Sequence, residues 1–277
     1  SGVFRCVEVR APEGSILNPR PPAAVAARAL TGYRIADTVF GCLAHIVPDK
    51  VMAAGEGGNT VVCISGYRPE SGEPFILVDM INGAWGGRVD QDGIEGVTNP
   101  SQNMSNLPVE TLEARYPIRI EEFGFAPDSC GAGRYRGGLG IVRTYTLLAD
   151  DALLQLRSDR THHAPYGLFG GEPGAKTVNL LNPQRNSEVL SGKVTRTIRS
   201  GDTLRHAQAG AGGYGDPLQR DPDLVARDVR NGKITGRYGR ERHGVVIGAD
   251  DAVDISATEA LRLEMRQARA VTEAHHG

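Results

Sequence analysis

The sequence has few of the features that mark a zinc-binding, redox-active or nucleic-acid-binding protein. Its four cysteines, at positions 6, 42, 63 and 130, lie far apart without a Cys-x-x-Cys pair, so neither a zinc ribbon nor a redox pair is supported. We therefore expect reduced thiols in a cytoplasmic protein. The net charge of −2 gives no reason to expect a nucleic acid or an anionic membrane as partner. No uncharged apolar run is long enough to span a bilayer.

Several familiar catalytic motifs are also missing. The sequence has no Gly-x-Ser-x-Gly nucleophile elbow and no His-Glu-x-x-His zinc motif. Gly170–Thr177 is close to a phosphate-binding loop, but Ala175 stands where that loop needs glycine, and a strand-like run follows where it needs a helix. The histidines are scattered, and the adjacent His162 and His163 cannot easily share one face of a strand. We therefore expect no complete metal site within this chain.

Glycine, in contrast, is abundant. The 277 residues include 36 glycines and 16 prolines, which lie between apolar runs without a fixed period. That pattern indicates many turns in an ordered protein rather than disorder. The stretch Pro127–Arg143 holds five glycines and three arginines, and a β-rich run rather than a helix follows Gly140. A structural corner tied down by ion pairs is favoured here over a dinucleotide site, while an anion site at the arginines stays open.

The apolar patterns predict an α+β fold, with β-rich mixed sheets built from hairpins, glycine-rich loops, one long N-terminal helix and C-terminal helices. Apolar residues spaced by three or four predict the long helix over about residues 23–47, with a stripe that packs in the core. Helices are also predicted over 221–231 and over 256–270, the latter capped by Ser256. Strands are predicted over 1–9, 60–67, 75–81, 117–123, 141–148, 152–157, 177–181 and 193–198.

Two pairs of these strands are predicted to form hairpins, 60–67 with 75–81 and 141–148 with 152–157. We expect one domain over residues 1–277, with a helical tail from about residue 220. The connection Asn82–Pro108 is long and irregular, and such loops are usually functional or disordered. Its tryptophan, Trp85, argues for order. Carboxylates in and near this connection could include a general base, although exposed loop carboxylates are more often solvated: Asp79, Asp90, Asp92, Glu110 and Glu113.

Read from end to end, the motifs resemble those of the hydantoinase B/5-oxoprolinase family, in the family's order. The matching stretches are Val9–Pro19, Gly83–Gly93, Ser105–Pro117, Asp128–Gly140, Tyr166–Gly174 and Gly212–Pro217. They resemble only the carboxyl-terminal half of the family's B-type polypeptide. The resemblance implies that an amino-terminal half, which carries a His/Asp metal-binding pattern in the family, is a partner of this chain.

The resemblance also implies an activity. Family members work with a hydantoinase A-like subunit that binds ATP and phosphorylates the carbonyl oxygen of a small-molecule substrate. The B-type polypeptide then completes the opening of a cyclic amide such as hydantoin or 5-oxoproline. ATP and a divalent metal are therefore expected in the complex, bound mainly by partner chains. Two alternatives stay open: a component of an ATP-dependent ketone carboxylase of the acetone or acetophenone type, and a non-catalytic assembly subunit.

Loop position and polarity select the candidate site residues under this interpretation. Catalytic roles are predicted for Asp92 and His162. Substrate-binding roles are predicted for six further residues: Asn82, Gly86, Gly87, Asn99, Asn106 and Arg160.

Overall fold

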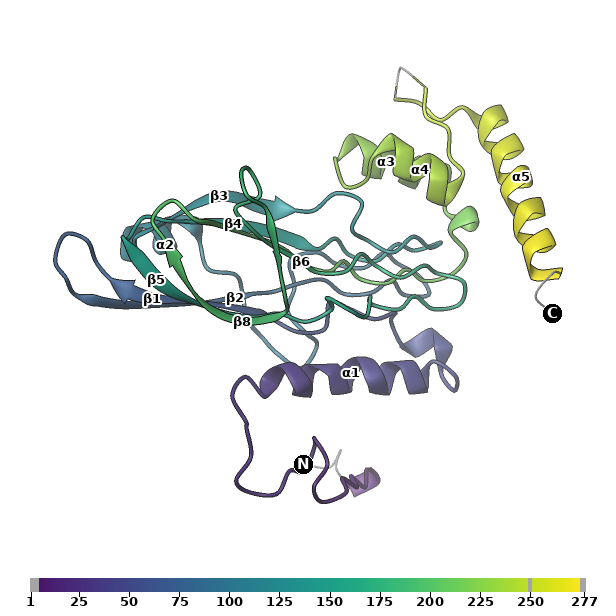
Figure 1. The fold of residues 1–277 in the computed structure, drawn as a ribbon. Coiled ribbons are helices and arrows are strands. Elements are labelled where there is room, and N and C mark those ends of the chain that lie inside the picture. Colours follow the sequence, from purple (N-terminus) through teal and green to yellow (C-terminus); the bar gives the residue numbers. More distant parts are fainter. Residues whose placement is uncertain (1–4, 249–250, 275–277) are drawn as a thin grey trace.

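The centre of the computed structural model, which describes residues 5–248 and 251–274, is a sandwich of two antiparallel sheets (Figure 1). The strands are β1 (Thr60–Tyr67), β2 (Pro74–Ile81), β3 (Ile118–Phe125), β4 (Ile141–Leu147), β5 (Asp151–Arg157), β6 (Val178–Leu181), β7 (Glu188–Leu190), β8 (Lys193–Arg199) and β9 (Thr203–Ala207). The helices are α1 (Ala29–Leu43), α2 (Val109–Arg115), α3 (Pro222–Arg230), α4 (Gly236–His243) and α5 (Ile255–Ala274). The predicted α+β class is confirmed, as is the hairpin of β1 and β2.

The main hydrophobic core lies between the two sheets. The four-stranded sheet has the order β2-β1-β5-β8, and the five-stranded sheet has the order β3-β4-β9-β6-β7. Leu77 of β2 and Leu154 of β5 face Tyr145 of β4 across the core, and each is at most 1% exposed. One ion pair also crosses this core. Asp79 on β2 and Arg143 on β4 are fully buried with 2.6 Å between their oxygen and nitrogen atoms.

The predicted hairpin of 141–148 with 152–157 is wrong, because its two strands belong to different sheets. β4 pairs with β3 and β9, whereas β5 pairs with β1 and β8. Residues 148–150 carry the chain from one sheet to the other, and the Ala149 side chain points into the core. A short polar connection between two β-rich runs can form either a hairpin within one sheet or a link between two sheets. Here the link forms, because the apolar faces of both strands are buried against each other between the sheets.

The long N-terminal helix is shorter than predicted, and its stripe is not part of the core. α1 starts at Ala29 and ends at Leu43, and its buried residue is the charged Asp37. The apolar positions of the stripe are half-buried or exposed. Residues 5–9, predicted as a strand, contain no strand, and residues 1–4 lie outside the described part.

The caps of the C-terminal helices were predicted with mixed success. Asp221 caps α3 as expected, since its carboxylate accepts a hydrogen bond from Asp223 N at 2.9 Å. The expected cap of α5 at Ser256 is wrong, because α5 starts at Ile255 and Asp254 accepts from Ala257 N at 2.9 Å. Four short elements were not predicted: α2, α4, β7 and β9.

Beside the sandwich lies a glycine bundle, which we define as residues 53–58, 83–95, 130–140, 166–174 and 209–215. These segments run side by side without regular strands and bond through their backbones. Gly212 N donates to Ala54 O at 2.8 Å, while its carbonyl accepts from Gly87 N at 2.9 Å. A Cβ built at Gly212 would lie 2.0 Å from Tyr166 O. Side chains are excluded at such positions, which explains the clustered glycines.

Helices surround this bundle. α1 runs below it in Figure 1, and α3 and α4 lie above it. A second apolar cluster joins α3, α4 and the bundle, including Cys130, Leu139, Val225 and Val245. None of the helices in residues 5–248 and 251–274 is long and apolar enough to cross a membrane.

The bundle geometry predicts a large penalty for one added methyl group. Gly212→Ala should lower the free energy of unfolding by at least about 3 kcal/mol, because the clash is with backbone rather than with a mobile side chain. Urea unfolding followed by circular dichroism measures this change. The control is Gly32→Ala, at an open site within α1, which should be neutral or slightly stabilising. Equal effects of the two substitutions would contradict the close-packing argument.

Candidate functional site

A first buried polar network ties α1 to the glycine bundle. We call it the Glu56 network and define it by five residues: Arg34, Asp37, Glu56, Asp159 and Arg160. Asp37 Oδ2 accepts hydrogen bonds from Arg160 Nη2 at 2.6 Å and from Arg34 Nη1 at 3.1 Å. Both guanidinium groups also donate to the backbone oxygen of Glu56. Buried charge, rather than an apolar stripe, therefore holds α1 in place.

The carboxyl group of Glu56 has an unusual protonation equilibrium. The residue is 2% exposed, and its Oε2 accepts from Gly58 N at 2.9 Å. Burial raises the pKa of Glu56 to about 7, although the positive charge of Arg34 opposes the shift. A neutral Glu56 leaves the two guanidinium groups facing two carboxylates, those of Asp37 and Asp159. A group with such a pKa can give or take a proton near neutral pH, as general acid–base catalysis requires.

Four of the predicted substrate-binding residues lie in or near the Glu56 network. Arg160 is part of it, and its guanidinium group is occupied by internal contacts. Asn99 is buried and donates to the bundle backbone at 3.1 Å. Asn106 Oδ1 accepts from the backbone N–H of Asn82 at 2.8 Å. The structure thus gathers these four residues into one region, and their role in substrate binding stays a prediction.

Asn82 is the member of this group with free hydrogen-bonding capacity. It is fully buried, and both polar atoms of its side chain lack a partner among the described residues. The next residue, Gly83, packs on Glu56 so closely that a Cβ there would lie 2.6 Å from the Glu56 Cβ atom. Asn59 and Thr60, just after Glu56 in sequence, also carry a buried oxygen without a hydrogen-bond donor among the described residues. Buried polar atoms without partners are uncommon in folded proteins, so this region is a candidate for binding a polar group from outside the described residues.

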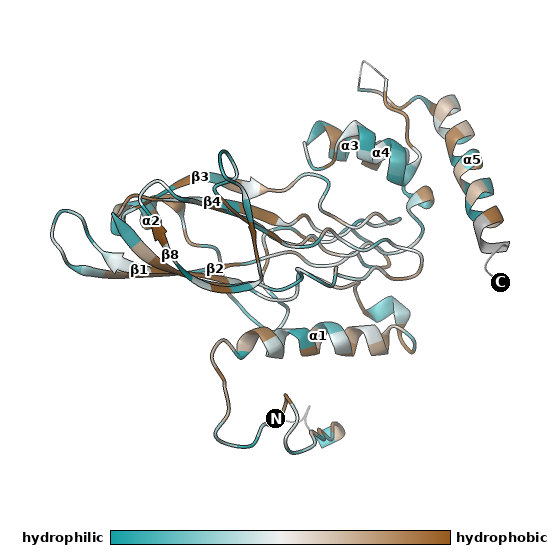
Figure 2. Ribbon diagram, in the orientation of Figure 1, coloured by the Kyte–Doolittle hydropathy of each residue, from teal (hydrophilic) through white to brown (hydrophobic). Residues whose placement is uncertain are grey.

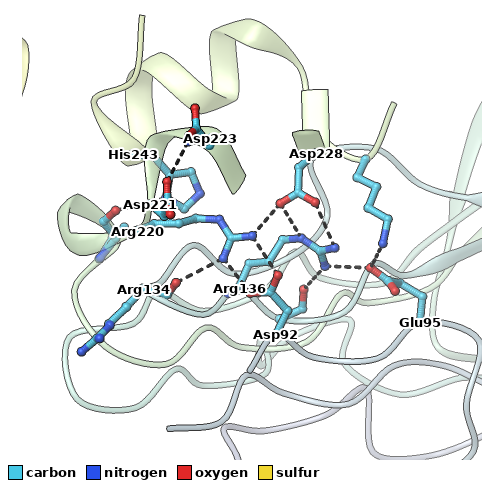
Figure 3. A network of polar contacts seen from close by, with 12 residues as sticks. Asp92, Glu95, Arg134, Arg136, Arg220, Asp221, Asp223, Asp228 and His243 are labelled. Carbon is cyan, nitrogen blue, oxygen red and sulfur yellow. Dashed lines mark hydrogen bonds and ion pairs between the residues drawn. The ribbon is translucent and has the colours of Figure 1, made fainter. Parts of the chain in front are cut away.

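A second buried polar network lies between the bundle and α3 (Figure 3). We call it the Asp92 network, and its members are Asp92, Glu95, Arg136, Arg220, Asp228 and Lys233. Arg220 is fully buried and donates two hydrogen bonds, of 2.6 and 2.8 Å, to the carboxylate of Asp92. Asp228 bridges Arg220 and Arg136. Three cations thus face three carboxylates, a balanced arrangement that joins α3 to the bundle.

Asp92, predicted as catalytic, is held in its charged form by this network. Burial alone would raise its pKa, but hydrogen bonds and positive charge from Arg220 hold the pKa below its usual value. Its Oδ1 also accepts from the backbone N–H of Arg136 at 2.9 Å. A carboxylate bound in this way is a weak base, so the geometry favours a structural role, and a catalytic role stays a prediction.

A pocket of about 230 Å³ opens where the long connection meets the end of α1. Its walls are partly apolar and partly charged, formed by Phe40, Asp49, Lys50, Val51, Met52, Trp85, Arg88, Val89, Asp90 and Pro100. The Trp85 indole is fixed by a 2.6 Å hydrogen bond to Thr98 O. The predicted residues Gly86 and Gly87 follow Trp85 but pack inside the glycine bundle, where a Cβ would meet backbone atoms of Ala53 or Tyr135.

His162, the other residue predicted as catalytic, is exposed on the loop after β5. Within residues 5–248 and 251–274, no group of three or more His, Cys, Asp or Glu side chains could hold a metal ion. The residues described here therefore do not fit a resident metal site.

The residues at the centre of each network were not predicted from the sequence, apart from Arg160 and Asp92. Glu56 lies in a glycine-rich connection, and a carboxylate between glycines, at Gly55-Glu56-Gly57, was the available signal. Asp37 sits on the expected helix at a position that the apolar stripe obscured. Arg220 and Asp228 come from a segment more than 100 residues beyond Asp92, so no local pattern links them.

The Glu56 pKa predicts a particular pH dependence of stability. A pKa raised in the folded state stabilises at low pH, and that contribution is lost as the pH rises through the folded value. Relative to Glu56→Gln, wild-type stability should therefore fall by roughly 3 kcal/mol between pH 4.5 and pH 8. Urea unfolding of both proteins across this range measures the difference. A difference that does not change with pH would contradict a buried carboxyl that titrates near neutrality.

The Asp92 network predicts the opposite pH dependence. Asp92→Asn should destabilise the protein by about 3 kcal/mol at pH 7, because Arg220 loses half of its buried counter-charge. Since the pKa of Asp92 is lowered, this difference should shrink as the pH falls below about 4. Asp90→Asn, two residues away and exposed, is the matched control and should change stability by less than about 0.5 kcal/mol. Thermal unfolding at pH 3 and pH 7 distinguishes the cases.

Comparison with known proteins connects this architecture to relatives. The sequence model of the hydantoinase B/oxoprolinase family matches residues 1–217. A protein of Pseudomonas sp. (strain NS671), named as the putative B component of a D-/L-hydantoinase, is 33% identical over 95% of this chain and 44% of its own length. The crystal structure of an ATP-dependent caprolactamase from Pseudomonas jessenii superimposes with a TM-score of 0.83 at 26% identity, covering 95% of this chain and 47% of that one.

A nucleotide-free acetone carboxylase structure has the same fold, with a TM-score of 0.71 at 22% identity over 83% of this chain and 35% of that one. The chain thus spans about half the length, or less, of these relatives. The family match covers residues 1–217, which include all the strands of both sheets described above. The chain belongs to the hydantoinase B/oxoprolinase family.

Proposed function

We propose that this chain is the carboxyl-terminal part of the B-type polypeptide of an ATP-dependent enzyme that opens a cyclic amide. The observation that carries this proposal is the 33% identity, over 95% of the chain, to a relative named as the B component of a hydantoinase. The likeness to the protein named as an ATP-dependent caprolactamase supports it. The likeness to the acetone carboxylase structure, at 22% identity, supports only a shared fold and not a shared reaction.

The chemistry of the reaction explains why several chains are needed. An amide carbonyl is a poor electrophile, and transfer of phosphate from ATP to its oxygen makes it a better one. Three of the glycine segments, 53–58, 130–140 and 166–174, lead into strands, and none of the five is followed directly by the α-helix N-terminus of a nucleotide fingerprint. We therefore propose that ATP and the divalent metal bind mainly to a hydantoinase A-like subunit and to the amino-terminal half.

The proposed contribution of this chain is to form part of the substrate site of the complex and to transfer protons there. Glu56 has the protonation equilibrium for that task, and Asn82 has buried donor and acceptor atoms available beside it. Asp92 and His162 remain the residues that the sequence predicts as catalytic. The opening of the ring requires that the departing nitrogen gain a proton, which a buried carboxyl with a pKa of about 7 can supply at neutral pH.

The purified complex, containing this chain and its partner chains, tests the proposal. Incubated with ATP and hydantoin, 5-oxoproline or ε-caprolactam, it should form the ring-opened acid together with ADP or AMP, as measured by chromatography. Parallel reactions with acetone or acetophenone and labelled bicarbonate test carboxylation. Label fixed in an acid-stable product, without ring opening of any amide, would replace the proposal by the carboxylase alternative. Neither product, from a complete and ATP-binding complex, would favour the assembly role.

The same assay tests proton transfer by Glu56. Glu56→Gln should lower kcat for ring opening by about 100-fold or more while leaving KM close to its wild-type value. The amide oxygen of glutamine can still accept from Gly58, so the local fold has a substitute contact. The control is Glu70→Gln, at an exposed carboxylate in the loop between β1 and β2. An unchanged kcat in Glu56→Gln would assign the carboxyl a structural role.

A further inference from the structure

The two sheets of the sandwich carry very different outer faces. On the five-stranded sheet, polar outward residues of β3, β4 and β9 bond to one another, beside the apolar pair Val142 and Ala207. Thr144 donates to Glu122 at 3.1 Å, Arg205 bonds the same carboxylate at 3.0 Å, and Thr146 donates to Glu121 at 2.7 Å. This is the ordinary pattern for an antiparallel sheet with one face in water.

The outer face of the four-stranded sheet is apolar along β1 and β2, although it is mostly polar along β5 and β8. Along β2 the outward residues Ile76, Val78 and Met80 are 65%, 46% and 37% exposed. The strand register places Val78 beside Cys63 and Met80 beside Val61 on β1. A strand with apolar residues on both faces is typical of a sheet that is covered on both sides.

A second exposed apolar surface lies on α1. Ile35, Val39, Leu43 and Ile46 recur at helical spacing and are 43%, 46%, 36% and 74% exposed. They lie beside the stripe that the sequence assigned to the core and share only Leu43 with it, and the Glu56 network anchors the opposite side of the helix. Figure 2 shows brown, hydrophobic segments both along α1 and along the strands.

A groove of about 940 Å³ adjoins the second of these surfaces, where Ile35 is part of its lining. It runs between residues 16–35 and the ends of β5 and β8, where Arg157 and Lys193 point outward. Arg28 and Arg34 add positive charge, and Asp159 is the acidic residue in its lining. In Figure 1 the four-stranded sheet is the lower layer of the sandwich, and α1 and residues 5–28 lie on the same side.

We propose that the apolar patch on β1 and β2, the groove and the exposed apolar side of α1, which lie on the same side of the sandwich, form one docking surface for the amino-terminal half of the B-type polypeptide. The proposal rests on the proposed function, since it names the surface for a partner assigned there. Relatives with the same fold are about twice as long, so their chains contain a segment of comparable size to cover it. The charge of the groove indicates that this segment presents apolar residues flanked by carboxylates.

The test uses the amino-terminal region co-expressed with this chain, tagged on one partner only. The double variant Ile76→Glu/Val78→Glu and the double variant Ile35→Glu/Val39→Glu should each weaken association by at least about tenfold, measured by titration calorimetry. The side chains are exposed in the isolated chain, so its unfolding midpoint should change little. The control Val189→Glu changes a residue 75% exposed on β7 of the other sheet and should leave association intact.

Hydrogen exchange provides a second measurement that does not depend on variants. Residues 74–81 and 35–46 should gain protection in the complex relative to the isolated chain. Unchanged affinity in both double variants, or equal loss in Val189→Glu, would overturn the proposal. A homodimer of this chain that dissociates in the β2 variant would assign the face to a second copy and would also overturn it. Association is measured without turnover, so a complex that forms as expected but opens no ring contradicts the proposed function alone.

Discussion

Direct contact between backbones in the glycine bundle is the constraint on which the rest of the structure depends. Segments from five parts of the chain approach so closely that carbonyl oxygens occupy the space where Cβ atoms would stand, as at Gly137, where a Cβ would lie 1.9 Å from Ala211 O. Backbone hydrogen bonds between the segments satisfy groups that ordinary strands would pair. The bundle thus places Glu56, Asn82 and Asp92 at fixed positions without contributing many side chains of its own.

Buried charge then decides how the helices sit on this bundle. Asp37 of α1 forms ion pairs with Arg34 and with Arg160, which bonds to the bundle. On the other side of the bundle, Arg220 pairs with both Asp92 and Asp228 and so joins α3 to the bundle. Buried ion pairs contribute modestly to net stability, but an unpaired member is costly, so such pairs select one arrangement over others. The two networks differ in protonation. Arg220 and Arg136 hold the pKa of Asp92 below its usual value. In the other network, Asp37 and Asp159 already balance the two arginines, and burial raises the pKa of Glu56 to about 7.

The sandwich and the surfaces around it suit a protein that works within a larger assembly. Polar residues on the outer face of the five-stranded sheet bond to one another, whereas β1 and β2 of the other sheet carry an apolar patch, and α1 with its exposed apolar residues lies on that side. Relatives that share the fold carry about as much chain again. The buried polar region near Glu56 and the pocket beside Trp85 lie at the end of α1 and in the bundle, next to that apolar side rather than on the polar face.

The sequence by itself determined the α+β class, most of the strands, the helices α3 and α5 and the family, because these depend on local periodicity and on the order of glycine-rich motifs. It also pointed to Asn82, Asn99, Asn106 and Arg160, which tertiary structure gathers near Glu56. Only the tertiary structure decided that β4 and β5 lie in different sheets, that the predicted stripe of α1 lies outside the core, and that Asp92 is paired with Arg220. Those outcomes depend on contacts between residues far apart in the chain, where the gain from pairing a buried charge or covering an apolar face outweighs any local preference.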